Sequence, residues 1–247
     1  METSSPAPRS GGLSAAVLKW IAQITMLVDH TGFSLYSAWR RAGHVPTYNL
    51  WLVYRVMRSI GRIAFPIYCF LLVEGYLHTR DVKKYSLRLF LFGLVSEIPF
   101  NMAFWGKWWD PSHQNVYFTL LLGLLAIWAW DRLTEKDVLR CAWWRKICAA
   151  AAVTAACLIA RYLRTDYQWV GVLVIFLMFL FREKQLLRFF SAGPALLLSS
   201  TTEMWSWPDF ILFKLYNGQR GRQAKYFFYV FYPAHLALLA VIAKLIR

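Results

Sequence analysis

Charged residues are scarce in this chain, and acidic residues are the scarcest among them. Only 17% of the 247 residues are charged, and Asp and Glu together number 13, whereas a soluble domain has about 25% charged residues. Hydrophobic residues make up 58% of the chain. This excludes a disordered protein and argues against a soluble globule, whose surface needs more charge. With 18% aromatic residues, 13 of the residues being Trp, the composition is typical of a membrane protein with two aromatic-rich interfaces.

Cysteine is also rare, and its spacing excludes the usual cysteine-based sites. The four cysteines show no CxxC or CxxH spacing, so we expect neither a disulfide framework nor a zinc site, and no bound metal. A Walker loop, a GxGxxG turn, a GxSxG elbow and a HExxH helix are all missing from the sequence. The familiar soluble chemistries are therefore unsupported.

The net charge of +15 suggests at first a nucleic-acid partner. However, the 28 Lys and Arg lie mainly in short clusters between apolar stretches. That pattern orients membrane spans, because basic loops stay in the cytoplasm. We therefore expect no nucleic acid to bind.

The apolar stretches predict an all-α polytopic bundle of eight or nine transmembrane spans with a cytoplasmic N-terminus. Residues 1–12 are rich in Ser, Pro and Gly and are expected to form a disordered leader, followed by one transmembrane domain over 13–247. A span requires about 20 apolar residues. The expected spans are 13–35, 50–77, 85–104, 116–130, 147–163, 169–181 and 226–246, with 186–216 forming either one span or a hairpin of two short ones.

Two details of these spans follow from single residues. A hairpin that turns near Glu203 and Pro208 leaves Arg220 and Arg222 in the cytoplasm, whereas a single span would place them outside. Positive charge therefore favours the hairpin. In the second span, Pro66 is expected to bend the helix.

Ionisable side chains inside the spans are the candidates for chemistry, because each one costs a few kcal/mol or more in hydrocarbon. Asp29 and His30 are neighbours in TMLVDHTG, before Gly32, which allows another backbone to approach. Histidine suits proton transfer near neutral pH, and a nearby carboxylate raises its basicity. The alternative is that His30 only hydrogen-bonds a neighbouring helix.

Arg62 is the most deeply placed cation of the second span. Together with Arg55 and Arg58 it forms one helical stripe, and it lies roughly 18 Å into the span at 1.5 Å per residue. That depth requires an anion, for which Asp29, Glu97 and a ligand's phosphate or carbonyl are the candidates. A purely structural Arg–carboxylate pair is equally compatible.

Three further groups of polar residues lie in or near spans. Glu74 and His78 are one helical turn apart and either cap the basic loop that follows or form a relay. The string SEIPFN sets Glu97 and Asn101 beside a proline break, where freed backbone groups can line a cavity. Near the C-terminus, FYPAH places Tyr232 and His235 on one helix face, where a lone histidine is more often structural.

Several strings of the sequence resemble the TraX family of polytopic bacterial membrane proteins. They occur in order from about residue 18 to 240 and include LKWIAQITMLVDHTG, GRIAFPIY, VEGY, SEIPFN, NVYFTLLLGLLAIW, DYQWVGVL, LYNGQRG and KYFFYVFYPAHL. The family is associated with conjugation and with acetylation of the pilin N-terminus. The resemblance implies an N- or O-acetyltransferase of the bacterial cytoplasmic membrane that uses acetyl-CoA as its acyl donor.

The resemblance also implies roles for the ionisable and polar residues inside the spans. His30 is similar to the essential histidine of type 3 membrane acyltransferases, which follows a basic residue, here Lys19, by eleven positions. His30 would act as the general base, oriented by Asp29. Arg62 or Asn115 would stabilise the oxyanion, and Glu97 is a further member of this catalytic set.

The donor site implied by the resemblance lies on the cytoplasmic side. There, basic residues of the loop HTRDVKKYSLR would hold the phosphates of acetyl-CoA, with Glu74 and His78 beside them. The acceptor would be an amine or hydroxyl of a pilin N-terminus, a small molecule or a glycan. The implied phosphate-binding residues are Arg80, Lys83, Lys84 and Arg88, and Asn217 of LYNGQRG is an additional candidate.

Two other classes of function remain compatible with the residues. In a transporter or channel, Asp29, His30, Arg62 and Glu97 would form a proton or ion path, but the sequence shows no internal repeat of the kind such proteins carry. In an assembly protein, the same residues would only join helices. The oligomeric state is left open by the sequence.

Overall fold

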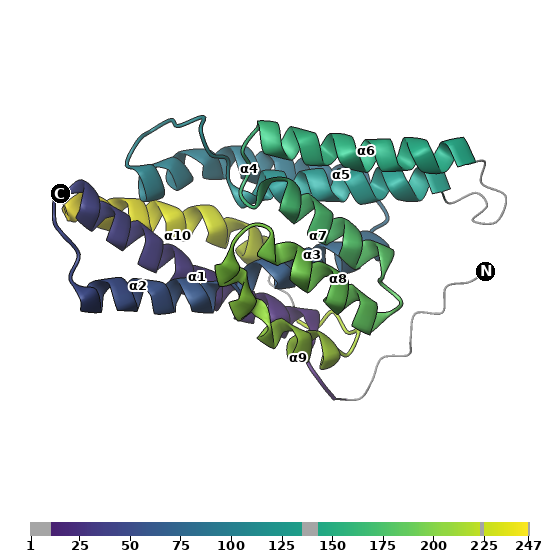
Figure 1. Ribbon diagram of the computed structural model, residues 1–247, viewed down its shortest axis with the longest axis horizontal. Coiled ribbons are helices and arrows are strands. Elements are labelled where there is room, and N and C mark those ends of the chain that lie inside the picture. The colour runs from purple at the N-terminus through teal and green to yellow at the C-terminus, as the bar shows by residue number, and fades with distance from the viewer. Residues whose placement is uncertain (1–10, 135–142, 223–224, 247) are drawn as a thin grey trace.

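The computed structural model describes residues 11–134, 143–222 and 225–246, and these form helices joined by short loops (Figure 1). The predicted all-α bundle is confirmed. Residues 1–10 of the predicted leader lie outside the described residues. The elements are α1 (Ala15–Arg41), α2 (Tyr48–Gly61), α3 (Ala64–Leu77), α4 (Val82–Trp105), α5 (Val116–Thr134), α6 (Trp143–Tyr162), α7 (Gln168–Leu180), α8 (Gln185–Leu197), the 3₁₀ helix η1 (Thr201–Ser206), α9 (Pro208–Lys214) and α10 (Lys225–Leu245).

Within the described parts of the chain, five helical segments are long and apolar enough to cross a membrane: Tyr48–Leu77, Val82–Trp105, Val116–Thr134, Trp143–Tyr162 and Phe227–Leu245. The chain is therefore a multi-pass membrane protein. α1 is long enough, with 27 residues, but its polar side chains make it less apolar than these five segments. The count of eight or nine spans and the side of the N-terminus stay predictions.

The segment from α8 to α9 turns back on itself, as the hairpin alternative predicts. α8 has 13 residues and is about 20 Å long, which is shorter than the roughly 30 Å hydrocarbon core. The main-chain N–H of Leu13 donates to the carbonyl of Leu215 at 2.8 Å, and that of Asn217 donates to Leu13 at 3.0 Å. The hairpin thus returns to the start of α1, although neither of its arms is long enough to cross.

The second predicted span is broken into α2 and α3 at Arg62 and Ile63. Pro66 is the cause, because it has no N–H to donate to the carbonyl of Arg62 and its ring crowds that carbonyl. The side chain of Arg62 turns inward at the break, where it is 11% exposed. Its Nε donates to the carbonyl of Arg58 at 3.1 Å and so satisfies one of the free carbonyls at the end of α2.

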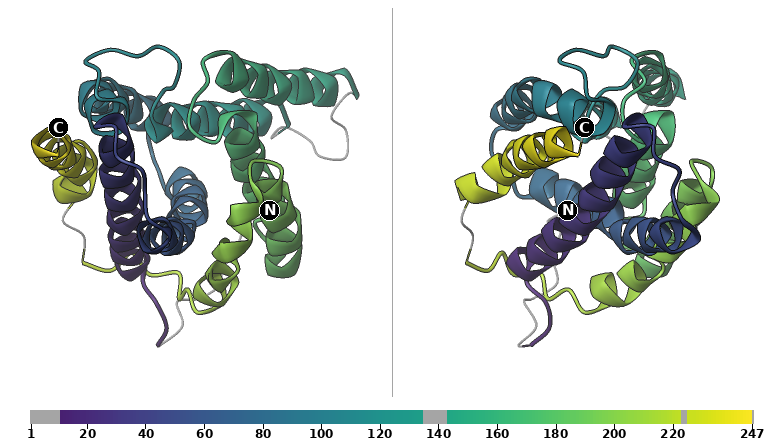
Figure 2. Two further views of the ribbon diagram at one scale, coloured as in Figure 1. Left: turned by 60° about the vertical axis from the view of Figure 1, so that its left-hand side comes forward. Right: turned by 90° about the vertical axis from the view of Figure 1, so that its left-hand side faces the viewer.

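α1 occupies the middle of one half of the bundle, between α2 and α10 (Figure 2). Two glycines let α1 and α2 approach closely. A Cβ added to Gly32 would lie 2.9 Å from Cβ of Met57, and one added to Gly61 would lie 2.1 Å from Cβ of Asp29. The expected close approach at Gly32 is therefore confirmed, and Gly61 brings α2 against the residue that carries the carboxylate.

We expect Gly61→Ala to lower the stability of the protein by roughly 1–3 kcal/mol, the usual range for overpacking a well-filled site. The added methyl group must displace Asp29. A matched control is Gly193→Ala, because the nearest atom to a Cβ there is 4.0 Å away, so this variant should be as stable as the native chain or slightly more stable. Thermal unfolding in detergent compares the two, and equal stability of both variants would contradict the close contact.

Most of the helices, α1 included, contribute to one apolar core, in which α10 packs against α4 and α5 against α7. Leu18, Ile67, Leu124, Ile175 and Leu236 are all completely buried in it. A second free carbonyl, inside the unbroken helix α10, is satisfied by a side chain. Pro233 inside α10 cannot donate to the carbonyl four residues earlier, and that carbonyl, of Tyr229, accepts a hydrogen bond from the hydroxyl of Tyr117 at 3.2 Å.

Candidate functional site

A buried ion cluster lies where α1, α2 and η1 meet. Arg62 is its centre: its Nη2 lies 2.7 Å from Oδ1 of Asp29 and its Nη1 lies 2.8 Å from Oε1 of Glu203. Arg58 pairs with the other oxygen of Asp29, and Nη1 of Arg62 also donates to the hydroxyl of Tyr167 at 3.1 Å. Asp29 was one of the predicted anions for Arg62. The sequence had not paired Glu203 with it.

The prediction that Asp29 orients His30 is wrong. Both oxygens of Asp29 are held by arginines, while Nδ1 of His30 lies 2.7 Å from Nε2 of His235. The reason is helical geometry, because adjacent residues of a helix point about 100° apart. Asp29 therefore faces α2, and His30 faces α10.

His30 and His235 form a stacked pair, with ring centroids 5.0 Å apart and planes tilted by 11°. Nδ1 of His235 lies 2.7 Å from the carbonyl oxygen of Phe231. The rings of Phe104 and Tyr232 meet His30 edge-on at 5.1 and 5.8 Å. The structure thus brings together His30 and both of the candidates that the FYPAH string supplied.

A small cavity of about 150 Å³ joins the ion cluster to His30. It lies toward the end of the bundle where α4 ends and α5 begins, because His113 and Gln114 of the connecting loop line it. We call it the histidine pocket. Its wall is otherwise mainly aromatic, and its lining includes Asp29, His30, Phe33, Arg58, Arg62, Phe65, Tyr68, Phe104, Trp105, Asp166 and Tyr167.

Glu97, Asn101 and Asn115 form a separate buried cluster that does not line the histidine pocket. Nδ2 of Asn115 donates to Oε2 of Glu97 at 2.5 Å and to the carbonyl of Gly93 at 2.8 Å. Its Oδ1 accepts from the main-chain N–H of Tyr117 at 3.1 Å, which caps the first turn of α5. Both amide hydrogens of Asn115 are thus used within this cluster, away from the histidine pocket, and its role at an oxyanion stays a prediction. Glu97 is not the anion that Arg62 meets, because Asp29 and Glu203 are.

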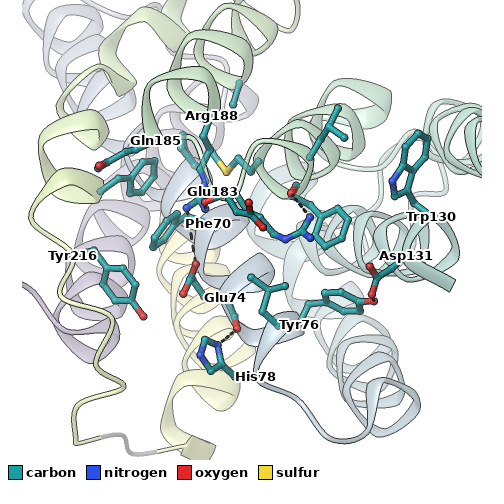
Figure 3. Close-up of a pocket in the computed structure, with 18 of the residues that line it drawn as sticks. Phe70, Glu74, Tyr76, His78, Trp130, Asp131, Glu183, Gln185, Arg188 and Tyr216 are labelled. Carbon is teal, nitrogen blue, oxygen red and sulfur yellow. Dashed lines mark hydrogen bonds and ion pairs between the residues drawn. The ribbon is translucent and has the colours of Figure 1, made fainter. Parts of the chain in front are cut away.

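A much larger cavity of about 2000 Å³ opens near the loop between α3 and α4 (Figure 3). We call it the basic cleft, because, of the residues that the structure describes, seven basic side chains line it against five acidic ones. Of the residues predicted to hold the donor, Glu74, His78, Arg80, Lys83 and Asn217 line the cleft, whereas Lys84 and Arg88 do not. The cleft adds cations that the sequence did not nominate: Arg132, Lys146, Arg182, Arg188 and Lys214.

Glu74 and His78 do not form the predicted side-chain relay. Nδ1 of His78 donates to the main-chain carbonyl of Glu74 at 2.8 Å, while the Glu74 carboxylate faces Arg188, 3.9 Å away, and hydrogen-bonds Tyr216. Figure 3 shows these groups around the cleft. Burial, together with the nearby Glu74 carboxylate, raises the pKa of Tyr216 to about 12, so its hydroxyl stays protonated and donates to Glu74.

Two buried carboxylates of the hairpin were missed as site residues by reasoning from the sequence. Glu203 is 2% exposed and pairs with Arg62. Asp209 is also 2% exposed and lines the basic cleft, and neither of its carboxylate oxygens has a hydrogen-bond partner among the described residues. Their signal was present in the sequence, because acids are rare here and these two lie between apolar helical segments.

The histidine pocket and the basic cleft meet at the first turn of α3. There Phe65 lines the pocket and the next residue, Pro66, lines the cleft. We call this turn the wall between the two cavities. Arg62 lines the histidine pocket, and its ion pair with Glu203 links the pocket side of the wall to η1.

Replacing Arg62 with Met should lower the stability by about 3–5 kcal/mol, because it leaves Glu203 buried without a counter-charge. The double variant Arg62→Met with Glu203→Gln should regain part of this loss. Asp29 keeps Arg58 as a partner in both variants. Unfolding in detergent measures the difference, and a double variant no more stable than Arg62→Met alone would show that the Arg62–Glu203 pair is not the reason for the loss.

The fold and the site define a multi-pass α-helical membrane protein with a buried ion cluster between two cavities. The chain belongs to the TraX family, since the family described as "TraX protein" matches residues 14–243. This confirms the predicted membership. The chain is also similar to the probable fimbrial assembly protein FimC, serogroup H1, of Dichelobacter nodosus, with 35% identity over 131 residues that cover 48% of this chain and 47% of the relative. The match thus spans about half the length of that curated relative. No solved structure matches the chain.

Proposed function

We propose that the protein is a membrane acetyltransferase that takes acetyl from acetyl-CoA and passes it to an amine or hydroxyl acceptor. The observation that carries this proposal is the presence, in one TraX-family chain, of a large basic cleft and a separate pocket containing a histidine. An acyl-CoA donor needs the first, and general base catalysis needs the second. Location in the bacterial cytoplasmic membrane is part of the same proposal.

The basic cleft suits a long donor with phosphates at one end. Arg80 lies in the loop between α3 and α4 and Lys83 at the start of α4, where phosphates would enter. Farther in, the cleft is lined by Phe70, Phe213 and Pro66. From His78 to Pro66 is twelve residues, roughly 18 Å along α3, which accommodates an extended pantetheine arm with its thioester at the wall beside Arg62.

The histidine pocket supplies the groups for the transfer. In the proposed step, Nε2 of His30 accepts the proton of the acceptor N–H or O–H as that atom bonds to the thioester carbonyl carbon. The C–S bond then breaks, and the thiolate of CoA leaves and takes up the proton from His30. Arg62 would stabilise the oxyanion. Its Nη2 uses one hydrogen on Asp29 and has no second partner among the described residues, which supports this role.

The wall between the two cavities must open for this step. The Arg62–Glu203 pair joins it to the hairpin, whose contacts with the rest of the bundle run mainly through α7 and α2. We therefore propose that donor binding moves the η1 segment away from Arg62, which would also release the arginine hydrogen bonds toward the reacting carbonyl. In this proposal, the ion pair of Glu203 with Arg62 keeps the wall closed until the donor binds.

A pilin-related acceptor is proposed from the comparisons. The similar protein of Dichelobacter nodosus is named as a probable fimbrial assembly protein, and fimbriae are built from pilin subunits. That name also supports a second candidate, an assembly factor that transfers no acyl group. The two candidates differ in whether the protein transfers acetyl from acetyl-CoA to an acceptor.

We expect acetyl-CoA to raise the thermal unfolding temperature of the purified protein, because a ligand that binds only the folded state stabilises it. Lys83→Gln should weaken this effect, and its matched control is Lys84→Gln. The two lysines are adjacent, but Lys83 lines the cleft while Lys84 pairs with Asp81 and is 77% exposed. Added salt should reduce binding. No stabilisation by acetyl-CoA, or equal effects of the two variants, would contradict the donor site.

His30→Ala should abolish acetyl transfer, since a general base contributes about 10²–10⁴-fold to the rate. It should leave stabilisation by acetyl-CoA unchanged, because His30 lies outside the basic cleft. The assay follows labelled acetyl from acetyl-CoA onto pilin and onto small amine and hydroxyl acceptors. Unchanged turnover in the variant would remove His30 from the mechanism, and donor binding without transfer by the native protein would favour the assembly factor.

A further inference from the structure

The hydrogen bonds of the two stacked histidines determine where their protons lie. Nδ1 of His235 is 2.7 Å from the main-chain carbonyl oxygen of Phe231. A carbonyl oxygen can only accept a hydrogen bond, so Nδ1 of His235 must carry a hydrogen. In a neutral imidazole only one nitrogen is protonated, and Nε2 of His235 is therefore an acceptor.

The proton position of His30 follows from that of His235. Nδ1 of His30 lies 2.7 Å from the acceptor Nε2 of His235, so this nitrogen must donate. His30 is then the tautomer with hydrogen on Nδ1 and a lone pair on Nε2. Nε2 has no hydrogen-bond partner within the described parts of the chain, and His30 lines the histidine pocket, so the basic nitrogen is available there.

We propose that His235 is a positioning residue that holds His30 in the Nδ1–H tautomer, so that Nε2 can accept a proton in the histidine pocket. The tautomer does not depend on the proposed function; only the use of Nε2 as a general base in acetyl transfer rests on it. His235 itself gains and loses no proton. When Nε2 of His30 takes a proton, the hydrogen on Nδ1 stays in place and continues to donate to His235.

The position of His235 is fixed from several sides. The carbonyl of Phe231 belongs to the same helix, α10, one turn earlier. α10 is joined to α5 nearby by the hydrogen bond from Tyr117 to the carbonyl that Pro233 leaves free. The ring of Phe231 stacks on His235 with centroids 5.0 Å apart. The imidazole therefore has a defined orientation, which an orienting group for a base requires.

Nitrogen NMR of the protein with ¹⁵N-labelled histidine tests the tautomer directly, without any substrate. At mildly alkaline pH we expect His30, identified by the signals lost in His30→Ala, to show a pyrrole-type Nδ1 and a pyridine-type Nε2. In His235→Phe, which keeps a flat ring but removes the acceptor, this preference should disappear. His44→Gln, in the α1–α2 loop, is the control, and it should leave the signals of His30 unchanged. A protonated Nε2 in the native protein, or the same tautomer in His235→Phe, would overturn the proposal.

Acetyl transfer provides the second readout. Turnover in His235→Phe should fall about tenfold or more, as part of the roughly 10²–10⁴-fold that a general base contributes. His235→Gln places an amide oxygen near the lost acceptor nitrogen and should restore most of the activity. Full activity in His235→Phe, or a folded His235→Gln as inactive as the Phe variant, would overturn the positioning role. If the native protein shows the expected tautomer but transfers no acetyl group, the proposed function fails while the proton assignment stands.

Discussion

The guanidinium of Arg62 is the constraint around which the rest of the structure is arranged. A charge at this depth in an apolar bundle is costly, and it is tolerated only because carboxylates meet it on two sides. Asp29 comes from α1 and Glu203 from η1, so a single side chain connects elements that lie far apart in the sequence. The break in the second helix, the close approach at Gly61 and the inward turn of the hairpin all serve to bring these three groups together.

Two prolines supply further polar contacts in the interior. Within a bilayer, a carbonyl freed by proline must find a partner inside the protein. Pro233 leaves the carbonyl of Tyr229 without its helical donor, and the hydroxyl of Tyr117 in α5 donates a hydrogen bond to it. Pro66 of α3 leaves the carbonyl of Arg62 without its helical donor, at the break where the Arg62 side chain turns inward. Each proline thus sets a polar contact between helices at a depth where hydrophobic packing alone would leave the helix positions loosely specified.

The two cavities give the bundle different chemistry at its two ends. The basic cleft lies at the end where α3 passes into α4 and where the hairpin returns to the start of α1. The histidine pocket lies toward the loops that follow α4 and precede α7. In the proposed reaction, the charged donor would enter from the end of the basic cleft and the acceptor from the end of the histidine pocket. They would meet at the wall formed by Phe65 and Pro66, beside the ion pair of Arg62 and Glu203.

The sequence by itself determined the helical class, most helix positions and the set of polar residues worth testing. It could do so because acids are rare here, so that each one in an apolar stretch is conspicuous, and because the TraX strings cover most of the chain. Only the tertiary structure decided which groups meet. Helical rotation turns Asp29 to α2 and His30 to α10, and folding brings Glu203 back across 141 positions to Arg62. The periodicity of the sequence determines which residues share one face of a helix. Which other helix packs against that face depends on how the whole bundle folds.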